Sequence, residues 1–432
     1  DALLDNTTGD NNVAVGENAL ANNTTASQNV ALGQNALLTS TTAADNIAIG
    51  HDAMRLATTG GNNIGIGTDA LRANTTGANN TAVGKTALNT TTTQSNNTAV
   101  GFQSLYTLNG GADNTAMGHN SLFNSTTCDN NVAIGKSAME NTTSGSNNVA
   151  VGYQALDANT TADNNTAVGR DALGANTTGA YNIAMGNYAL DANTTANANI
   201  GIGYSALGAN TTGTLNVAIG HESLDANTTG DSNTAVGTYA LGANTTGTEN
   251  VAVGAYAGDA LTTGSYNTAI GYIALSAATT ASDNTAVGRE ALRDNTSGDN
   301  NVGVGKEALK LNTTGTDNTA IGNHAMNVNT TGTANVAVGS LAGDTLTTGG
   351  SNVAVGYEAL GGASTHSNNT AVGFSALKAN TSDNNTAVGY NAGAAITTGA
   401  ANAVFGRAAL DACTTGGYNN AFGYDCLTEC TT

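Results

Sequence analysis

Few residues in this 432-residue chain have the type and spacing that chemistry requires. Metal binding and acid–base catalysis need clustered His, Cys or carboxylate side chains. The five histidines are scattered instead: His51, His119, His221, His324 and His366. There is no Gly-x-Ser-x-Gly elbow, no cysteine pair with zinc spacing and no Walker loop. The 31 acidic residues fall irregularly, which favours a solvated face over calcium sites. We therefore expect no enzyme, no metal and no cofactor.

The cysteines offer one covalent candidate. Cys413 and Cys430 are separated by one period of the repeat that runs through the chain, so they occupy equivalent positions in adjacent units. Successive turns of such a structure place equivalent Cα atoms ~5 Å apart, within disulfide range. A Cys413–Cys430 disulfide is therefore predicted, with two small buried thiols as the alternative. Four cysteines in 432 residues do not make a disulfide framework.

Recurrent Asn-Thr-Thr phrases are a second kind of candidate site. They match the acceptor pattern for N-linked sugar, and adjacent threonines can carry O-linked sugar. Thr75, Thr76, Thr177 and Thr178 represent the candidate threonines. Turn chemistry alone also explains the phrase, because Gly with Asn or Asp neighbours favours turns. Both interpretations stay open at this stage.

These residues must be positioned by a repeat that fills the whole chain. The phrase Asn-x-Ala-x-Gly, with Gly or Val in place of Ala in four units, occurs 25 times, and its closing glycine returns with a period of 17 from Gly16 to Gly423, with one interval of 16 after Gly373. Self-similarity this strict is typical of a solenoid. We predict an all-β chain: a parallel β-solenoid of about 25 coils, one for each repeat unit, forming a single continuous repeat domain over 1–432. Both ends fall within a repeat unit, so we expect no capping element at either.

Counting from the glycine as position 0, the strand of each coil should occupy positions −3 to −1. Position −1 is always apolar and position −3 is Val, Ile or Thr in most units, so period-two alternation predicts that both face the core. Position −2 is Ala or Gly in 24 units, which we interpret as a face packed closely against another surface, either another side of the same coil or a neighbouring chain. Position −4 is Asn in all 25 units and should form a ladder of stacked amides, rather than a row of ligands. Its first members are Asn12, Asn29, Asn46, Asn63, Asn80, Asn97, Asn114 and Asn131.

The second half of each unit predicts a turn, and the single one-residue deletion falls in this segment, at residues 380–383, where a loop would tolerate it. Position +4 is usually Leu and position +7 usually Asn, but in three units a glycine at +4 is followed by Leu261, Leu346 or Ile396 at +7. This exchange indicates that both positions reach the same part of the core. All 11 basic residues stand at +1 or +5, which we expect to be solvated edges.

The net charge and the lack of long apolar stretches exclude some classes of binding partner. A net charge of −20 argues against nucleic acid and anionic membranes. No stretch approaches the ~20 apolar residues of a membrane span, so no membrane insertion is expected.

The repeat phrase, for example residues 131–138, NVAIGKSA, resembles the head repeats of trimeric autotransporter adhesins and related phrases in phage and bacterial tail-fibre-like surface proteins. Residues 15–20, VGENAL, also fit the hexapeptide pattern of left-handed β-helices. The resemblance covers every repeat, through roughly half of the positions in each unit. It implies a left-handed parallel β-roll, association of three chains and binding of surfaces, although this period is longer than the family's usual one.

Two hypotheses for function follow. The first is a non-enzymatic extracellular structural protein, a fibre or adhesin shaft on a cell or virion surface that associates with itself end to end or side by side. The second is a carbohydrate- or surface-binding adhesin head or phage tail fibre, with surface glycans as partners of the +1 and +5 columns. An ice-binding solenoid ranks third, because the paired threonines are adjacent rather than at alternate positions.

Overall fold

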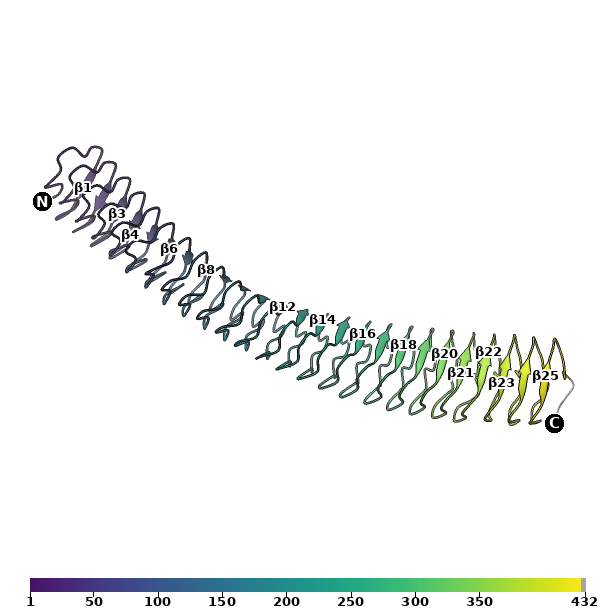
Figure 1. Cartoon of the computed structure of the whole chain (residues 1–432). Coiled ribbons are helices and arrows are strands. Elements are labelled where there is room, and N and C mark those ends of the chain that lie inside the picture. The colour runs from purple at the N-terminus through teal and green to yellow at the C-terminus, as the bar shows by residue number, and fades with distance from the viewer. Residues whose placement is uncertain (429–432) are drawn as a thin grey trace. The chain divides into compact units, whose positions relative to one another are not determined.

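The computed structural model describes residues 1–428. They contain 25 β-strands of three residues each and no helix, and turns make up the rest of every coil (Figure 1). The predicted parallel β-solenoid with a period of 17 residues is confirmed. The chain divides into two compact units, residues 1–215 and 216–432, and both are built from the same coil.

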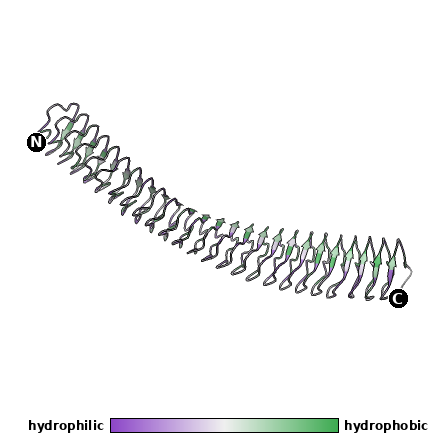
Figure 2. Cartoon of the chain, in the orientation of Figure 1, coloured by the Kyte–Doolittle hydropathy of each residue, from purple (hydrophilic) through white to green (hydrophobic). Residues whose placement is uncertain are grey.

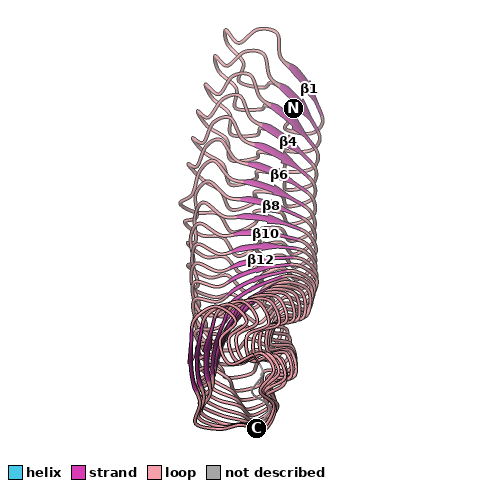
Figure 3. Cartoon of the chain, turned by 90° about the vertical axis from the view of Figure 1, so that its right-hand side faces the viewer, coloured by secondary structure: helices cyan, strands magenta, loops and turns pink. Residues whose placement is uncertain are grey.

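The first unit holds β1 to β12. Figure 3 shows these strands stacked one above another. Their bounds are β1 (Val13–Val15), β2 (Val30–Leu32), β3 (Ile47–Ile49), β4 (Ile64–Ile66), β5 (Thr81–Val83), β6 (Thr98–Val100), β7 (Thr115–Met117), β8 (Val132–Ile134), β9 (Val149–Val151), β10 (Thr166–Val168), β11 (Ile183–Met185) and β12 (Ile200–Ile202).

The second unit holds β13 to β25. Their bounds are β13 (Val217–Ile219), β14 (Thr234–Val236), β15 (Val251–Val253), β16 (Thr268–Ile270), β17 (Thr285–Val287), β18 (Val302–Val304), β19 (Thr319–Ile321), β20 (Val336–Val338), β21 (Val353–Val355), β22 (Thr370–Val372), β23 (Thr386–Val388), β24 (Ala403–Phe405) and β25 (Asn420–Phe422).

Within each unit, consecutive strands pair in parallel and in register. Val132 lies opposite Val149, so each residue stacks on its equivalent one period later. The single shortened interval keeps this register, because Thr370 lies opposite Thr386. The missing residue is absorbed in the loop around 380–383, as the sequence predicted. Hydrogen bonds between coils continue beyond the strands: the N–H of Met139 donates to the carbonyl of Ala155 (3.0 Å), and that of Thr143 to Thr160 (2.9 Å).

The chain turns at residues with left-handed backbone angles. The closing glycine has φ between +131° and +145° in all 25 units. A Cβ on Gly254 would lie 2.6 Å from the carbonyl oxygen of Gly271 in the next coil, so only glycine fits here. Positions −5, +2 and +4 also take positive φ in most units, for example Asn164 (60°), Asp171 (53°) and Leu173 (53°). These bends compress each repeat unit into one small coil.

The prediction that positions −3 and −1 face the core was wrong, whereas close packing of position −2 against another side of the coil is confirmed. The small residue at −2 points into the coil, and every alanine of this column from Ala31 to Ala421 is at most 2 % exposed. Positions −3 and −1 point outward: Ile134 is 38 % exposed and Met185 44 %. Figure 2 colours many of these strands as hydrophobic, and in each strand the residues at −3 and −1 are at least partly exposed.

The reason is the narrow interior of the coil. Opposite the strand, the side chain at +4 fills the space: a Cβ on Gly65 would lie 2.7 Å from Cγ of Met54, the +4 residue eleven positions earlier. The same spacing joins Gly201 to Leu190. Only a methyl group or a hydrogen fits at −2 beside such a side chain. Val404, the one larger residue at −2, stands eleven positions after Gly393, where +4 has no side chain.

The exchange between +4 and +7 is confirmed. Leu261, Leu346 and Ile396 at +7 are at most 1 % exposed, like the leucines that usually stand at +4. A Cβ on Gly393 would lie 2.8 Å from Cδ1 of Ile396, so the two positions reach the same part of the core. The coil after β6 holds fully buried leucines at both positions, Leu105 and Leu108, so the core there accommodates the two side chains together. The core thus consists of Ala, Leu and a few equivalents, flanked by buried asparagines.

Candidate functional site

The predicted asparagine ladder is confirmed. Along the first unit the backbone N–H of each member donates to Oδ1 of the preceding one, at 2.9–3.0 Å over all eight predicted residues: Asn12, Asn29, Asn46, Asn63, Asn80, Asn97, Asn114 and Asn131. Seven of them are 0–1 % exposed, and Asn12 is half-buried.

The amide nitrogens of the ladder have a different main partner from the one expected. Asn131 Nδ2 donates to the carbonyl of Gly145 at position +10 (2.9 Å) and also to Asn114 Oδ1 (3.2 Å). Each amide therefore bonds to a main-chain carbonyl and bridges to the neighbouring coil. Because these atoms are satisfied inside the solenoid, the column serves the fold rather than a ligand.

A second ladder at position +7 was missed by the sequence reasoning. Asn176 Nδ2 donates to Gly179 O (2.9 Å), and Asn193 Nδ2 donates to Asn176 Oδ1 (2.9 Å). Similar bonds join successive +7 asparagines wherever they follow one another within one unit: Asn6 and Asn23, then Asn159, Asn176, Asn193 and Asn210 in the first unit, and Asn227 and Asn244, then Asn295, Asn312 and Asn329 in the second. The repeated Asn at +7 was visible in the sequence, but it also fits a turn.

The four candidate threonines fall into two kinds. Thr75 and Thr177 at +8 are half-buried, and their hydroxyls donate to the carbonyls of Thr92 and Thr194, each at 3.0 Å. Thr76 and Thr178 at +9 are exposed. Of each pair, only the second threonine offers an accessible hydroxyl for O-linked sugar, so that prediction now concerns Thr76 and Thr178. The asparagines of these phrases, Asn74 and Asn176, are fully buried, which denies access to N-linked sugar in the folded coil.

The predicted disulfide involves Cys430, which lies outside the described residues. Cys413 is buried, and its sulfur lies 3.9 Å from the amide nitrogen of Asn419. Cys128 is also buried, and burial raises the pKa of its thiol.

Residues 1–428 contain no group of three or more His, Cys, Asp or Glu arranged to hold a metal ion. No pocket opens on the surface that these residues form. The same part of the chain has no helix that could cross a membrane. The surface is therefore best described as columns of equivalent side chains, of which three are notable: charged, aromatic and apolar.

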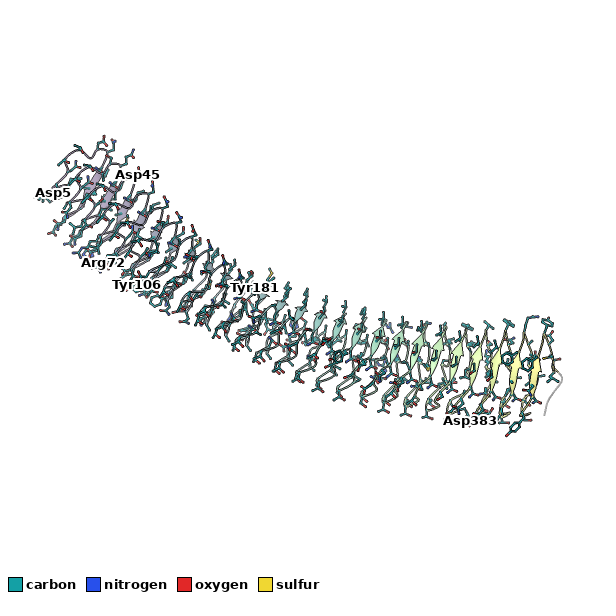
Figure 4. The ribbon with its side chains drawn as sticks, viewed as in Figure 1. Asp5, Asp45, Arg72, Tyr106, Tyr181 and Asp383 are labelled. Atoms are coloured by element: carbon teal, nitrogen blue, oxygen red, sulfur yellow. The ribbon has the colours of Figure 1, made fainter. Side chains whose placement is uncertain are left out.

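The charged columns are solvated, as predicted: none of the basic residues at +1 and +5 is buried. Figure 4 shows Arg72 on the outside of the coil, where its Nε lies 3.5 Å from Asp69 Oδ1. The densest network lies after β17 and β18, where Lys310 Nζ lies 2.7 Å from Glu290 Oε2 and 3.2 Å from Glu307 Oε2. Burial alone would raise the pKa of Glu307, but hydrogen bonds from Lys310 and Lys306 lower it to about 2.

The aromatic columns were not anticipated. None of the 13 tyrosines and 5 phenylalanines is buried among the described residues. Eight stand at +1 and three at +2, immediately after the closing glycine: Phe102, Tyr153, Tyr204, Tyr272, Tyr357, Phe374, Tyr390 and Tyr424, then Tyr188, Tyr239 and Tyr256. Others, such as Tyr106, lie elsewhere on the outside of the coil (Figure 4).

The longest aromatic row occupies five successive coils at the end of the second unit. Phe374 stacks between Tyr357 and Tyr390, with ring centroids 5.4 and 5.1 Å apart. The guanidinium of Arg407 then lies 5.8 Å from the ring centre of Tyr390 and 5.0 Å from that of Tyr424. Such contacts stabilise aromatic and cationic neighbours. The row also exposes ring edges and tyrosine hydroxyls to solvent.

The apolar columns are the outward side chains at −3 and −1. We call them the outward sheet face. Position −1 is apolar in all 25 strands, and position −3 is Val, Ile, Ala or Thr except at Asn420. Neither column contains a charged residue.

Comparison with protein-family models and with curated proteins finds no match to this sequence. The resemblance to autotransporter head repeats therefore remains a prediction that rests on the repeat phrase.

Proposed function

We propose that this chain is a non-enzymatic extracellular structural protein that acts as a fibre or adhesin shaft. Its task is to resist unfolding and proteolysis while spanning distance, and its assembly is with other copies of itself. The observation that supports this most directly is the buried Asn ladder, because within each unit it ties successive coils together through side chains as well as through the main chain.

The ladder suits a mechanical role because its bonds are many and equivalent. Pulling one coil away breaks main-chain bonds such as Val132 N–H to Asn148 O (2.9 Å) together with the ladder bond from Asn148 N–H to Asn131 Oδ1 (2.9 Å). The groups that form these bonds are buried, so each broken bond leaves a polar group without a hydrogen-bond partner or exposes it to solvent. No single side chain carries the load, which is the property that a shaft requires.

Single-molecule pulling tests the mechanical part of the proposal. The purified chain, held by its ends, should unfold in steps that each release one or a few coils, and one coil extends by at most ~60 Å. The variant with Asn131→Ala and Asn318→Ala should release its first coils at lower force. A chain that extends smoothly without steps, or that thermolysin digests as fast as an unfolded control, contradicts the proposal.

The assembly and location need separate measurements. Electron microscopy of the purified chain should show elongated particles or filaments with an axial repeat of ~4.8 Å. Antibodies against the chain should label intact cells or particles of its source without permeabilisation. Labelling only after permeabilisation would contradict the extracellular assignment, and globular particles would contradict the shaft.

A second candidate function is binding of surface glycans, and the aromatic columns favour it. The rings beside the closing glycine lie on the surface, and the core contains no aromatic side chain among the described residues. Sugars bind aromatic rings and neighbouring polar groups in shallow sites. The stacked row from Tyr357 to Tyr390 presents ring edges and hydroxyls to a ligand. Tyr272 does not belong to this row, and its side chain is 54 % exposed.

A glycan array with the purified chain tests this candidate. Binding should fall when Tyr357, Phe374 and Tyr390 are replaced together by Ser, which occurs at +1 in another coil as Ser340. The matched control replaces Thr229, Thr246 and Thr263 by Ser on the +9 column, which leaves the aromatic row intact. Equal binding by both variants would remove the aromatic row as the glycan site.

A further inference from the structure

The outward sheet face presents two columns of mostly apolar side chains along the sheet of each unit. It is built largely from stiff β-branched side chains at the same two positions of every strand. In the second unit Val251, Val253 and Ile321 are 36, 37 and 41 % exposed, and at the end of the face Phe405 and Phe422 stack with ring centroids 5.0 Å apart. None of these side chains has a partner layer within its own coil, because the interior lies on the opposite side of the strand.

The size of the face is large for a free surface. Twelve strands at ~4.8 Å make the face of the first unit roughly 58 Å long, and two columns about 7 Å apart with their side chains make it about 10 Å wide. The resulting area is about 600 Å², at the upper end of the apolar patches that monomeric proteins expose. Two such faces packed together would remove roughly 1,200 Å² from solvent, where the range of stable specific interfaces begins.

The distribution of charge indicates how a second copy of the chain could bind. Two copies with a net charge of −20 repel each other over most of their surfaces. The outward sheet face has no charged residue, so two copies can approach through this apolar surface without bringing like charges together. Equal strand spacing on both partners lets each outward row fit between rows of the other, as in packed β-sheets ~10 Å apart.

We infer that the outward sheet face binds the same face of a second copy of this chain, and that this face-to-face pair is the unit from which the fibre is built. The contact is isologous, since each copy contributes the same columns. This inference rests on the proposed structural function and names the surface through which its self-association occurs. It differs from end-to-end growth, which would leave the face exposed.

Analytical ultracentrifugation of the full chain at ~10 µM tests the pairing, with charge introduced on the face. Ile134→Lys and Ile321→Lys place one lysine on the face of each unit. The matched control, Asn187→Lys and Asn323→Lys, adds the same charges at +1, where lysine and arginine already occur. We expect the parent and the control to sediment as dimers or larger assemblies, and the face variant to dissociate at least about tenfold more readily, because a buried lysine lacks a partner.

A conservative variant guards against loss of folding. Val151→Cys keeps the size of the side chain on the face, and Asn187→Cys places a thiol at +1. Maleimide should modify position 151 more slowly than position 187 in the assembled chain, and at a similar rate after dilution to the monomer. Equal rates in the assembled chain would overturn the inference.

The remaining outcomes separate this inference from the proposed function. A parent that stays monomeric yet resists thermolysin overturns the pairing and leaves the shaft intact. A face variant that assembles like the parent also overturns it, since association then uses another surface. A monomer that produces thermal hysteresis in ice assigns the face to ice instead, and a chain that thermolysin digests readily refutes the shaft itself.

Discussion

The exchange between positions +4 and +7 allows a quantitative test of how the core is filled. In the coil of β20, Gly343 stands at +4 and Leu346 at +7, whereas the commonest combination at these positions is Leu with Asn. A Cβ on Gly343 would lie 2.9 Å from Cδ1 of Leu346 and 3.3 Å from Cγ of Met326. Gly343→Leu alone therefore overpacks the core, and we expect it to lower the free energy of unfolding of this coil by ~1–3 kcal/mol.

Leu346→Asn alone should also destabilise the coil. It removes a side chain that is 1 % exposed and leaves a cavity, which costs about 2–4 kcal/mol. Part of this loss is recovered, because Asn329 Oδ1 is a buried acceptor without a partner at the point where Leu346 interrupts the second ladder. An amide at position 346 can donate to it, a bond worth ~1 kcal/mol.

The double variant restores the usual arrangement, with Leu in the core at +4 and Asn extending the ladder at +7. Leucine already takes the required backbone angle at +4 elsewhere, for example φ 53° at Leu173. We expect the double variant to lie within about 1 kcal/mol of the parent, which gives a coupling of roughly 2–4 kcal/mol between the two changes.

The assay must be local, because long repeat arrays need not unfold in a single step. Native-state hydrogen exchange of the amides in the coil of β20 reports the opening free energy of that coil. The control combines Gly343→Leu with Leu261→Asn, five coils away, and its two effects should add. If the losses of Gly343→Leu and Leu346→Asn also add, the side chains at positions 343 and 346 do not share one volume, and the reasoning is refuted.

Three further predictions follow from the turns, the ladder and the carboxylates. Gly254→Ala should lower the thermal midpoint strongly, through a loss of about 2 kcal/mol or more, because its Cβ would meet Gly271 O at 2.6 Å with φ at +134°. A midpoint equal to that of the parent would show that the turn can shift. Asn131→Ala should cost ~1–3 kcal/mol, since it removes the acceptor of Asn148 N–H, and exchange at that amide should accelerate while amides several coils away keep the parent rate. Acidification should first stabilise the fold: burial raises the pKa of Asp157 and Asp259 above 3.8, so their protonation favours the folded state as pH falls toward ~4. Burial alone would raise the pKa of Glu307, but its hydrogen bonds to Lys310 and Lys306 lower it to about 2. The stability that Glu307 contributes to the fold is therefore complete above pH 4.5 and is lost as the pH falls from 4.5 to 2. Thermal midpoints measured from pH 8 to 2 should therefore peak on the acidic side of neutral, and a steady decline from pH 7 would contradict these assignments.

Much of the fold could be predicted because the repeat constrains it 25 times over. The period fixed the coil length and the parallel register, and Asn at −4 in every unit predicted the ladder that joins Asn12 to Asn131. The three glycines at +4 revealed that +4 and +7 fill the same volume. The one-residue deletion pointed correctly to a loop around 380–383. Each of these inferences depended on comparing units with one another rather than on any one unit.

The candidate surfaces were harder to predict. Thr75 and Thr76 are neighbours of the same type, yet one hydroxyl is bonded between coils and the other is exposed, which depends on the path of the turn. The aromatic row from Tyr357 to Tyr424 is spread over five repeat units, and only stacking of the coils brings its rings within contact. The +7 ladder was hidden because asparagine favours both turns and buried amide stacks.

The sequence by itself determined the period, the register and the residues that must repeat. The tertiary structure alone decided which face of each strand is inside. A strand of three residues alternates too briefly for hydrophobicity to settle its orientation, and the apolar pair at −3 and −1 pointed to the wrong answer. The coil interior is only wide enough for the side chain at +4, as the contact between Met54 and position 65 shows. The alanine therefore points into the coil, and the larger apolar side chains point outward, on the face where we propose that a second copy binds.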